Sequence, residues 1–171
     1  MNDFALKHKG FTIIELMITL VIAGVLASIA APSFSNIIKN NRMTTQYNEL
    51  LASLSLARSE AVKQSENVII LSNNGAVWND GWTIFIDADS DTVPDANEII
   101  RVHGALSGGN ILRFNSATNK ITYIGSGLTK GGSNGTFTLC DDRGNSERKG
   151  LIISNTGRAR HAVSSDTLAG C

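Results

Sequence analysis

The strongest constraint in this sequence is an apolar run close to its N-terminus. The run extends from Phe11 to Ala31, contains 21 residues and carries a single charge, Glu15. As an α-helix it would be about 30 Å long, which matches the hydrocarbon core of a bilayer. A carboxylate costs roughly 2.5–3.5 kcal/mol at the centre of a membrane helix and less near its end, so it needs a partner. An α-amino group released by cleavage after Gly10 would be such a partner.

The junction before this run resembles a known processing signal. A short polar leader, residues 1–10, is followed by Phe-Thr-Ile-Ile-Glu-Leu-Met. This pattern resembles the class III signal of type IV pilins and type II secretion pseudopilins. The resemblance implies cleavage between Gly10 and Phe11 by a prepilin peptidase, and N-methylation of Phe11. It also implies that Glu15 pairs with the N-terminal amine of a neighbouring subunit. The alternatives are an ordinary membrane anchor, or a secretory signal, which would need a small-x-small site and no internal acid.

The chain is expected to have one membrane helix and one globular domain. Residues 11–35 are predicted to form a single-pass transmembrane and assembly helix in the inner membrane, with 36–171 as a periplasmic domain. Pro32 predicts a kink or loosened backbone bonding. The pattern from Ser33 to Gln64 stays helical but becomes amphipathic. Its apolar positions are Met43, Tyr47, Leu50, Leu51, Leu54, Ala57 and Ala61. We expect this face to pack on the protein's own β-sheet.

After Glu66 the sequence changes to short β-branched runs separated by Gly, Asn and Ser. Such runs predict strands, and the separating residues predict turns. The predicted strands are Val68–Leu71, Trp82–Ile86, Ile99–His103, Ile111–Phe114, Ile121–Ile124, Thr136–Cys140, Leu151–Ser154 and Arg158–Val163. The fold class is therefore α+β, with one long N-terminal helix packed on antiparallel sheets. We expect Trp78 and Trp82 to pack in the core and not to form an exposed stacking surface.

Four internal segments narrow the resemblance to one branch of the pilins. In chain order they are Ala57-Arg58-Ser59-Glu60-Ala61, Gly81-Trp82-Thr83-Ile84-Phe85-Ile86-Asp87, Asp95 with Glu98-Ile99-Ile100, and Gly157-Arg158-Ala159-Arg160. Their order resembles the FimT/GspH group, which contains minor pilins and H-type minor pseudopilins. The resemblance implies assembly with other pilin subunits into a pilus that reaches the cell surface. The alternative is an H-type pseudopilin of a type II secretion system.

The two cysteines, Cys140 and Cys171, are predicted to form a disulfide. An even number of cysteines in a translocated domain favours a bridge over free thiols. Closing a loop of about 30 residues would contribute on the order of 3–4 kcal/mol and would tether the C-terminal tail. The alternative is two free thiols.

The C-terminal region carries the candidate ligand-binding residues. In an extended strand Arg158 and Arg160 lie on the same face, because side chains alternate with period 2. The other candidates are Arg143, Arg148, Lys149 and His161. Such cations bind DNA phosphates by counterion release, and no aromatic residue lies among them to read bases. In FimT-type pilins with a Gly-Arg-x-Arg tail, the resemblance implies DNA capture in natural transformation. The alternative is a solvated basic edge, or salt bridges to Asp141, Asp142 and Glu147.

An acidic segment has the spacing of a calcium-binding loop. Oxygen ligands fall at positions 1, 3, 5, 9 and 12 of a 12-residue loop. They are Asp87, Asp89, Asp91, Asp95 and Glu98. Thr92 stands where such a loop has Gly, Pro94 restricts the backbone, and no helix is predicted on either side. The sequence therefore favours a metal-free acidic turn, with calcium as the alternative.

No catalytic motif is apparent. The histidines are His8, His103 and His161, and none has a nucleophile or zinc-ligand spacing around it. We expect no enzymatic activity, no cofactor and no small-molecule substrate.

Overall fold

The computed structural model describes residues 10–75, 77–163 and 166–171. These residues form two compact units, one ending at Lys39 and the other beginning at Asn40. Apart from Gly10, the predicted leader lies outside the described residues.

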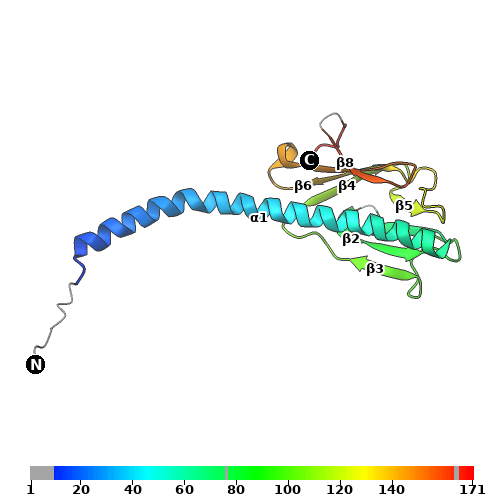
Figure 1. Cartoon of the computed structure of the whole chain (residues 1–171), viewed down its shortest axis with the longest axis horizontal. Coiled ribbons are helices and arrows are strands. Elements are labelled where there is room, and N and C mark those ends of the chain that lie inside the picture. The colour runs from blue at the N-terminus through cyan, green and yellow to red at the C-terminus, as the bar shows by residue number, and fades with distance from the viewer. Residues whose placement is uncertain (1–9, 76, 164–165) are drawn as a thin grey trace, which may run out of the picture. The chain divides into compact units, whose positions relative to one another are not determined.

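One long helix, α1 (Ile13–Gln64), contributes to both units (Figure 1). It begins two residues after the predicted start and ends at the predicted Gln64. The helix is continuous through Pro32, and the predicted kink stays a prediction. Its N-terminal part is long and apolar enough to cross a membrane, and the side chains of this part are not buried within the protein.

The second unit contains two four-stranded antiparallel sheets, as predicted. The first sheet has the order β3-β2-β1-β5 and the second β4-β6-β7-β8. The strands of the first sheet are β1 (Val68–Asn74), β2 (Val77–Ile86), β3 (Ile99–His103) and β5 (Lys120–Tyr123). Those of the second are β4 (Ile111–Ser116), β6 (Gly135–Cys140), β7 (Lys149–Ile153) and β8 (Ala159–His161). All eight predicted strands are present. β2 begins at Val77, five residues before the predicted Trp82, and the other strand ends differ from the prediction by at most three residues.

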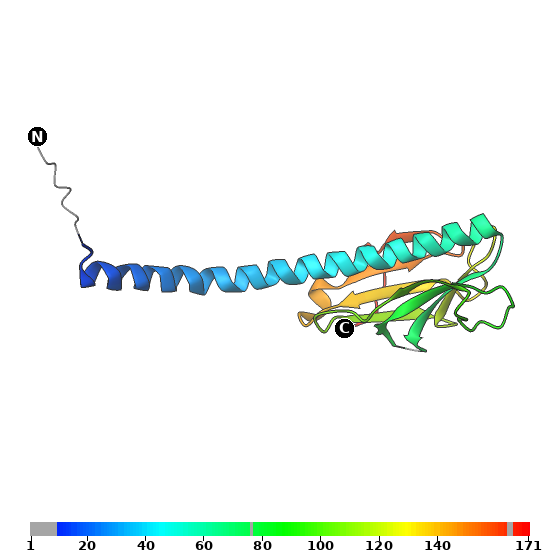
Figure 2. The same ribbon diagram turned by 90° about the horizontal axis from the view of Figure 1, so that it is seen from below.

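The core of this unit lies between the C-terminal half of α1 and the two sheets, which Figure 2 shows from below. The predicted apolar face of the helix is confirmed except at Leu51, which is only partly buried. Gln46 and Ser53 are also buried on this helix. Trp78 and Trp82 are both fully buried, so the prediction that they pack in the core is confirmed.

The predicted disulfide joins Cys140, at the end of β6, to Cys171. The tail is held further by two hydrogen bonds. Arg113 Nη2 donates to the carbonyl oxygen of Cys171 at 3.3 Å, and the Cys171 amide donates to Asn145 Oδ1 at 2.7 Å. The C-terminal residue is therefore fixed beside the sheet that carries the basic region.

Candidate sites at the helix N-terminus and the C-terminal strand

Glu15 forms a reciprocal cap with Thr12 at the start of α1. Its Oε2 accepts hydrogen bonds from the amide and the hydroxyl of Thr12, both at 2.8 Å. In return, the Glu15 amide donates to Thr12 Oγ1 at 3.2 Å. A carboxylate in the first turn of a helix is favoured by the helix dipole. Glu15 Oε1 accepts no hydrogen bond from any residue that the structure describes. It could therefore accept one from a donor on another molecule.

The apolar residues that follow Glu15 are exposed. Those at least half exposed include Phe11, Ile14, Leu16, Leu20, Val21, Leu26, Ile29, Phe34 and Ile38. An apolar surface of this extent marks an interaction with a membrane or with other proteins.

Three of the predicted cations line one cavity of about 470 Å³ beside β7 and β8. Arg148 Nη1 donates to the carbonyl oxygen of Ala169 at 3.2 Å, and Lys149 Nζ donates to Thr44 Oγ1 at 2.7 Å. His161 stacks on the ring of Tyr47, with centroids 4.6 Å apart. These contacts orient the three side chains, and none of them involves a carboxylate.

Arg160, on β8, forms an ion pair with Asp166. Its Nη1 lies 2.7 Å from Asp166 Oδ2, and its Nη2 lies 2.9 Å from Oδ1. The pair lowers the pKa of Asp166 to about 2 and raises the pKa of Arg160, because each charge is stabilised by the other. Arg160 is thus partly neutralised within the subunit.

Arg143 forms an ion pair of its own, with Asp141. Its Nη2 and Nε donate to Asp141 Oδ2 at 2.6 and 2.9 Å, and Nη1 donates to Asn40 Oδ1 at 2.8 Å. The hydrogen bonds to Asp141, and then the negative charge of that carboxylate, raise the pKa of Arg143. The alternative prediction of a salt bridge to Asp141 is confirmed for this residue.

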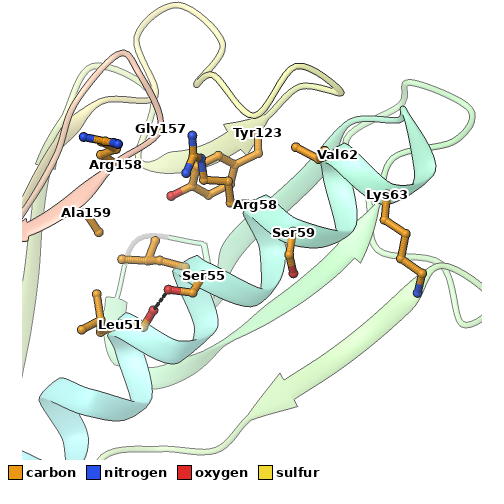
Figure 3. Close-up of a pocket in the computed structure, with 11 residues that line it drawn as sticks. Leu51, Ser55, Arg58, Ser59, Val62, Lys63, Tyr123, Gly157, Arg158 and Ala159 are labelled. Carbon is orange, nitrogen blue, oxygen red and sulfur yellow. Dashed lines mark hydrogen bonds between the residues drawn. The ribbon is translucent and has the colours of Figure 1, made fainter.

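Arg158 lies at a different place, in an open groove of about 650 Å³ between α1 and the turn before β8 (Figure 3). Its guanidinium is exposed and forms no hydrogen bond or ion pair with any residue that the structure describes. Lys63 and Arg58 line the same groove. Arg58 Nε donates to the carbonyl oxygen of Gly127 at 2.8 Å, and Nη2 donates to that of Thr156 at 3.4 Å.

The acidic segment forms the loop between β2 and β3. Asp87, Asp89 and Asp91 place one carboxylate oxygen each within 4.8 Å of one another. Asp87 and Glu98 are buried, and Asp95 is exposed.

The sequence of this chain matches two protein-family models. A model of the type II transport protein GspH matches residues 46–157, more than half of the chain. The chain belongs to the GspH family. A model of the prokaryotic N-terminal methylation motif matches residues 6–31. The chain is therefore a FimT/GspH-like minor type IV pilin or pseudopilin, as the sequence predicted.

Two solved structures have the same fold as this GspH-family chain. The crystal structure of the type IV minor pilin FimU from Pseudomonas aeruginosa gives a TM-score of 0.66 at 26% identity. The match covers 79% of this chain and 98% of FimU. The minor pseudopilin EpsH from Vibrio cholerae gives a TM-score of 0.53 at 14% identity, over 73% of this chain and 99% of EpsH. The likeness to EpsH concerns the fold alone.

The similarity to fimbrial proteins is shorter. Fimbrial protein Q of Moraxella bovis is 48% identical over 45 residues, which are 26% of this chain and 29% of that protein. A fimbrial protein of Pseudomonas aeruginosa is 33% identical over 76 residues, or 44% of this chain and 49% of that protein. The chain therefore matches less than a third of the length of the Moraxella bovis protein and about half of the length of the Pseudomonas aeruginosa protein.

In this GspH-family chain the six predicted binding residues occupy three places. Arg148, Lys149 and His161 line one cavity next to Arg160, Arg143 lies with Asp141, and Arg158 lies in the groove with Arg58. Asp166 and Arg58 were not predicted to contribute. No sequence pattern around Asp166 indicated its contact with Arg160, whereas Arg58 lies in the Ala-Arg-Ser-Glu-Ala motif.

Proposed function

We propose that this chain is a minor subunit of a type IV pilus, processed between Gly10 and Phe11 by a prepilin peptidase and methylated at Phe11. Before assembly, Phe11 to Ala31 anchors it in the inner membrane with its globular domain in the periplasm. During assembly, the same surface packs against the helices of neighbouring pilin subunits.

The observation that carries this proposal is the exposed apolar surface of α1 with Glu15 at its start. The match to FimU, a minor pilin, supports the same interpretation. Glu15 Oε1 has no donor among the described residues, and the methylated amine of a neighbouring Phe11 would be one. The pairing would compensate for placing a carboxylate in an apolar environment.

The experiment is to replace Glu15 with Ala and with Gln in the full-length chain. Processing at Gly10 should continue in both variants, while incorporation into sheared pili should fall at least tenfold. The matched control is Glu60→Gln, which removes a carboxylate near the other end of the same helix. Normal incorporation of Glu15→Ala would contradict the pairing role.

We further propose that the basic C-terminal region binds DNA without sequence preference and supports DNA uptake in natural transformation. The observation that favours it is the exposed guanidinium of Arg158, which has no ion pair with any described residue, together with Arg148, Lys149 and His161 around one cavity. Phosphate contacts of this kind give affinity that falls steeply with salt.

The test is a gel shift of the full-length protein in detergent with duplex and single-stranded DNA, across a salt series. Arg158→Gln should weaken binding and reduce the salt slope by about one. The control is Arg101→Gln, because Arg101 is an exposed arginine on β3, in the other sheet. Absence of binding at low salt, or equal binding by both variants, would contradict the DNA proposal.

The second candidate function is that of an H-type pseudopilin in a type II secretion system. The match to the GspH model favours it, since that model is named for a type II transport protein. This subunit would assemble by the same helix but would contact exported proteins or other pseudopilins. Deleting the gene distinguishes the two candidate functions. Loss of protein secretion with intact natural transformation would support the pseudopilin, and the reverse would support the DNA-binding pilin.

A further inference from the structure

We propose that the loop between β2 and β3 binds one divalent cation, calcium in preference to magnesium, through Asp87, Asp89, Asp91 and Glu98. The sequence favoured a metal-free turn for this segment because Thr92 replaces the usual glycine. The structure gives two independent observations that favour a cation, one from the three aspartates and one from Glu98. The proposal does not depend on whether the chain binds DNA.

The first observation is the convergence of three carboxylates. Asp87, Asp89 and Asp91 each place an oxygen within 4.8 Å of the other two. None of these residues forms an ion pair with any residue in the ranges that the structure describes. Lys120 and Lys130 line a neighbouring cavity of about 170 Å³ with Asp87, but neither ammonium is within salt-bridge distance of it. Three like charges this close repel one another, and a bound cation removes that repulsion.

The second observation is the buried carboxylate of Glu98. This residue is only 8% exposed, and its Oε2 has no hydrogen-bond partner among the residues that the structure describes. Its Oε1 accepts a bond at 3.1 Å from the amide of Ala88, the residue between Asp87 and Asp89. The side chain therefore reaches the loop where the aspartates converge. A buried carboxylate oxygen without a donor is unfavourable, and a cation would supply the missing interaction.

The backbone of the loop already holds the carboxylates in place. The amide of Thr92 donates to Asp87 Oδ1 at 2.8 Å, and the amide of Val93 donates to Asp91 Oδ1 at 2.7 Å. Thr92 has a φ of 65°, the left-handed conformation that glycine adopts most easily. Threonine at this position thus does not prevent the turn, although it adopts the conformation at a cost in strain.

The ligand chemistry selects the class of metal. The three clustered aspartates are joined by no histidine or cysteine, and Glu98, bonded to the loop at Ala88, adds a fourth carboxylate. Oxygen-only sites suit calcium and magnesium, not zinc or copper. Calcium accepts six to eight oxygens in flexible geometry, whereas magnesium demands a near-ideal octahedron and keeps several waters. An irregular loop with one bidentate candidate, Glu98, fits calcium better.

The experiment uses the full-length chain in detergent, stripped of metal with EDTA and titrated with calcium chloride by calorimetry. We expect one saturable site per chain with a dissociation constant of about 10⁻⁵–10⁻³ M. At about 10 mM calcium the melting temperature should rise by roughly 5–10 °C, and by less with the same concentration of magnesium. No saturable binding, or equal shifts with both metals, would overturn the proposal.

Four variants distinguish a metal site from general charge screening. Asp89→Asn and Asp91→Asn change exposed side chains and should weaken calcium binding at least tenfold. Glu147→Gln, an exposed carboxylate outside the loop, should bind within twofold of the wild type. Glu98→Gln should be at least as stable as the wild type in EDTA, because it removes a buried charge, yet lose the calcium-induced shift. Calcium binding that survives in Glu98→Gln would overturn the assignment of Glu98.

Discussion

Arg160 and Asp166 form a two-pronged ion pair on the surface beside β8, with nitrogen–oxygen distances of 2.7 and 2.9 Å. Asp166 Oδ2 also accepts a hydrogen bond from the amide of Val163 at 2.7 Å. The carboxylate therefore fixes the conformation of Arg160 and occupies the guanidinium face that a phosphate would use. Binding of DNA by Arg160 has to compete with this internal anion.

Replacing Asp166 with Asn should strengthen DNA binding. The amide keeps an acceptor for Val163 but removes the charge that competes for Arg160. We expect the affinity for DNA to rise by about two- to fivefold. The slope of log affinity against log salt concentration should steepen by about one, which corresponds to one more phosphate contact. Asp80→Asn removes one negative charge from the other sheet and controls for net charge. A gel shift across a salt series measures the affinity and its salt dependence. Equal increases in affinity for Asp166→Asn and Asp80→Asn would exclude a role for the Arg160–Asp166 pair.

The same pair predicts how stability responds to acid. The folded pKa of Asp166, about 2, lies below its ordinary value near 3.8. Its stabilising contribution is therefore fully present above the ordinary pKa and is lost as the pH falls through the folded value. Urea unfolding of the full chain at about pH 6 and pH 3 should show a smaller loss of stability in Asp166→Asn than in the wild type. Asp80→Asn should lose as much stability as the wild type.

The fold was predictable because its signals are local. Each strand is a short β-branched or aromatic run between turn residues, and the buried face of α1 repeats at helical spacing. The disulfide followed from a count of two cysteines. The strands, the buried helix face and the disulfide can each be predicted without knowing which distant segments of the chain contact one another.

The arrangement of the binding region was less predictable because it depends on long-range contacts. Arg58 is positioned by carbonyl groups 69 and 98 residues away in sequence, and nothing in its own motif indicates them. Arg158 and Arg160 were predicted to share a face of one strand. Instead, β8 begins after Arg158, Arg160 forms an ion pair with Asp166, and Arg158 forms none with any residue that the structure describes. The loop at Thr92 depends on local backbone conformation, since Thr92 adopts a φ of 65° that its residue type does not favour.

Gly157→Ala should destabilise the second unit. Gly157 has a φ of 74°, and an added Cβ would lie only 2.1 Å from the carbonyl oxygen of Gly127. Backbone strain and this clash together should cost about 2–4 kcal/mol. Gly131→Ala is the matched control, because a Cβ there meets no atom within 4 Å. Chemical unfolding should show a large loss for Gly157→Ala and a loss below about 0.5 kcal/mol for Gly131→Ala. Similar losses in the two variants would contradict the close-contact argument.

Arg58→Met should also destabilise this unit. The methionine keeps much of the aliphatic stem but loses the donors to the carbonyl oxygens of Gly127 and Thr156. We expect a loss of about 1–3 kcal/mol in the free energy of unfolding. Lys63→Met changes an exposed cation in the same groove and should cost less than about 0.5 kcal/mol. Equal effects would mean that the bonds made by Arg58 contribute little.

Reduction of the Cys140–Cys171 bridge should lower both stability and the order of the basic region. The bridge closes a loop with a sequence separation of 31 residues. Opening such a loop costs about 3–4 kcal/mol in the chain-entropy description. It also releases the tail that supplies the Ala169 carbonyl to Arg148. The double variant Cys140→Ser/Cys171→Ser should unfold at the same urea concentration as the reduced wild type, with hydrogen exchange increased most between residues 166 and 171. A loss below about 1 kcal/mol, or exchange unchanged in the tail, would show that other contacts hold the C-terminus.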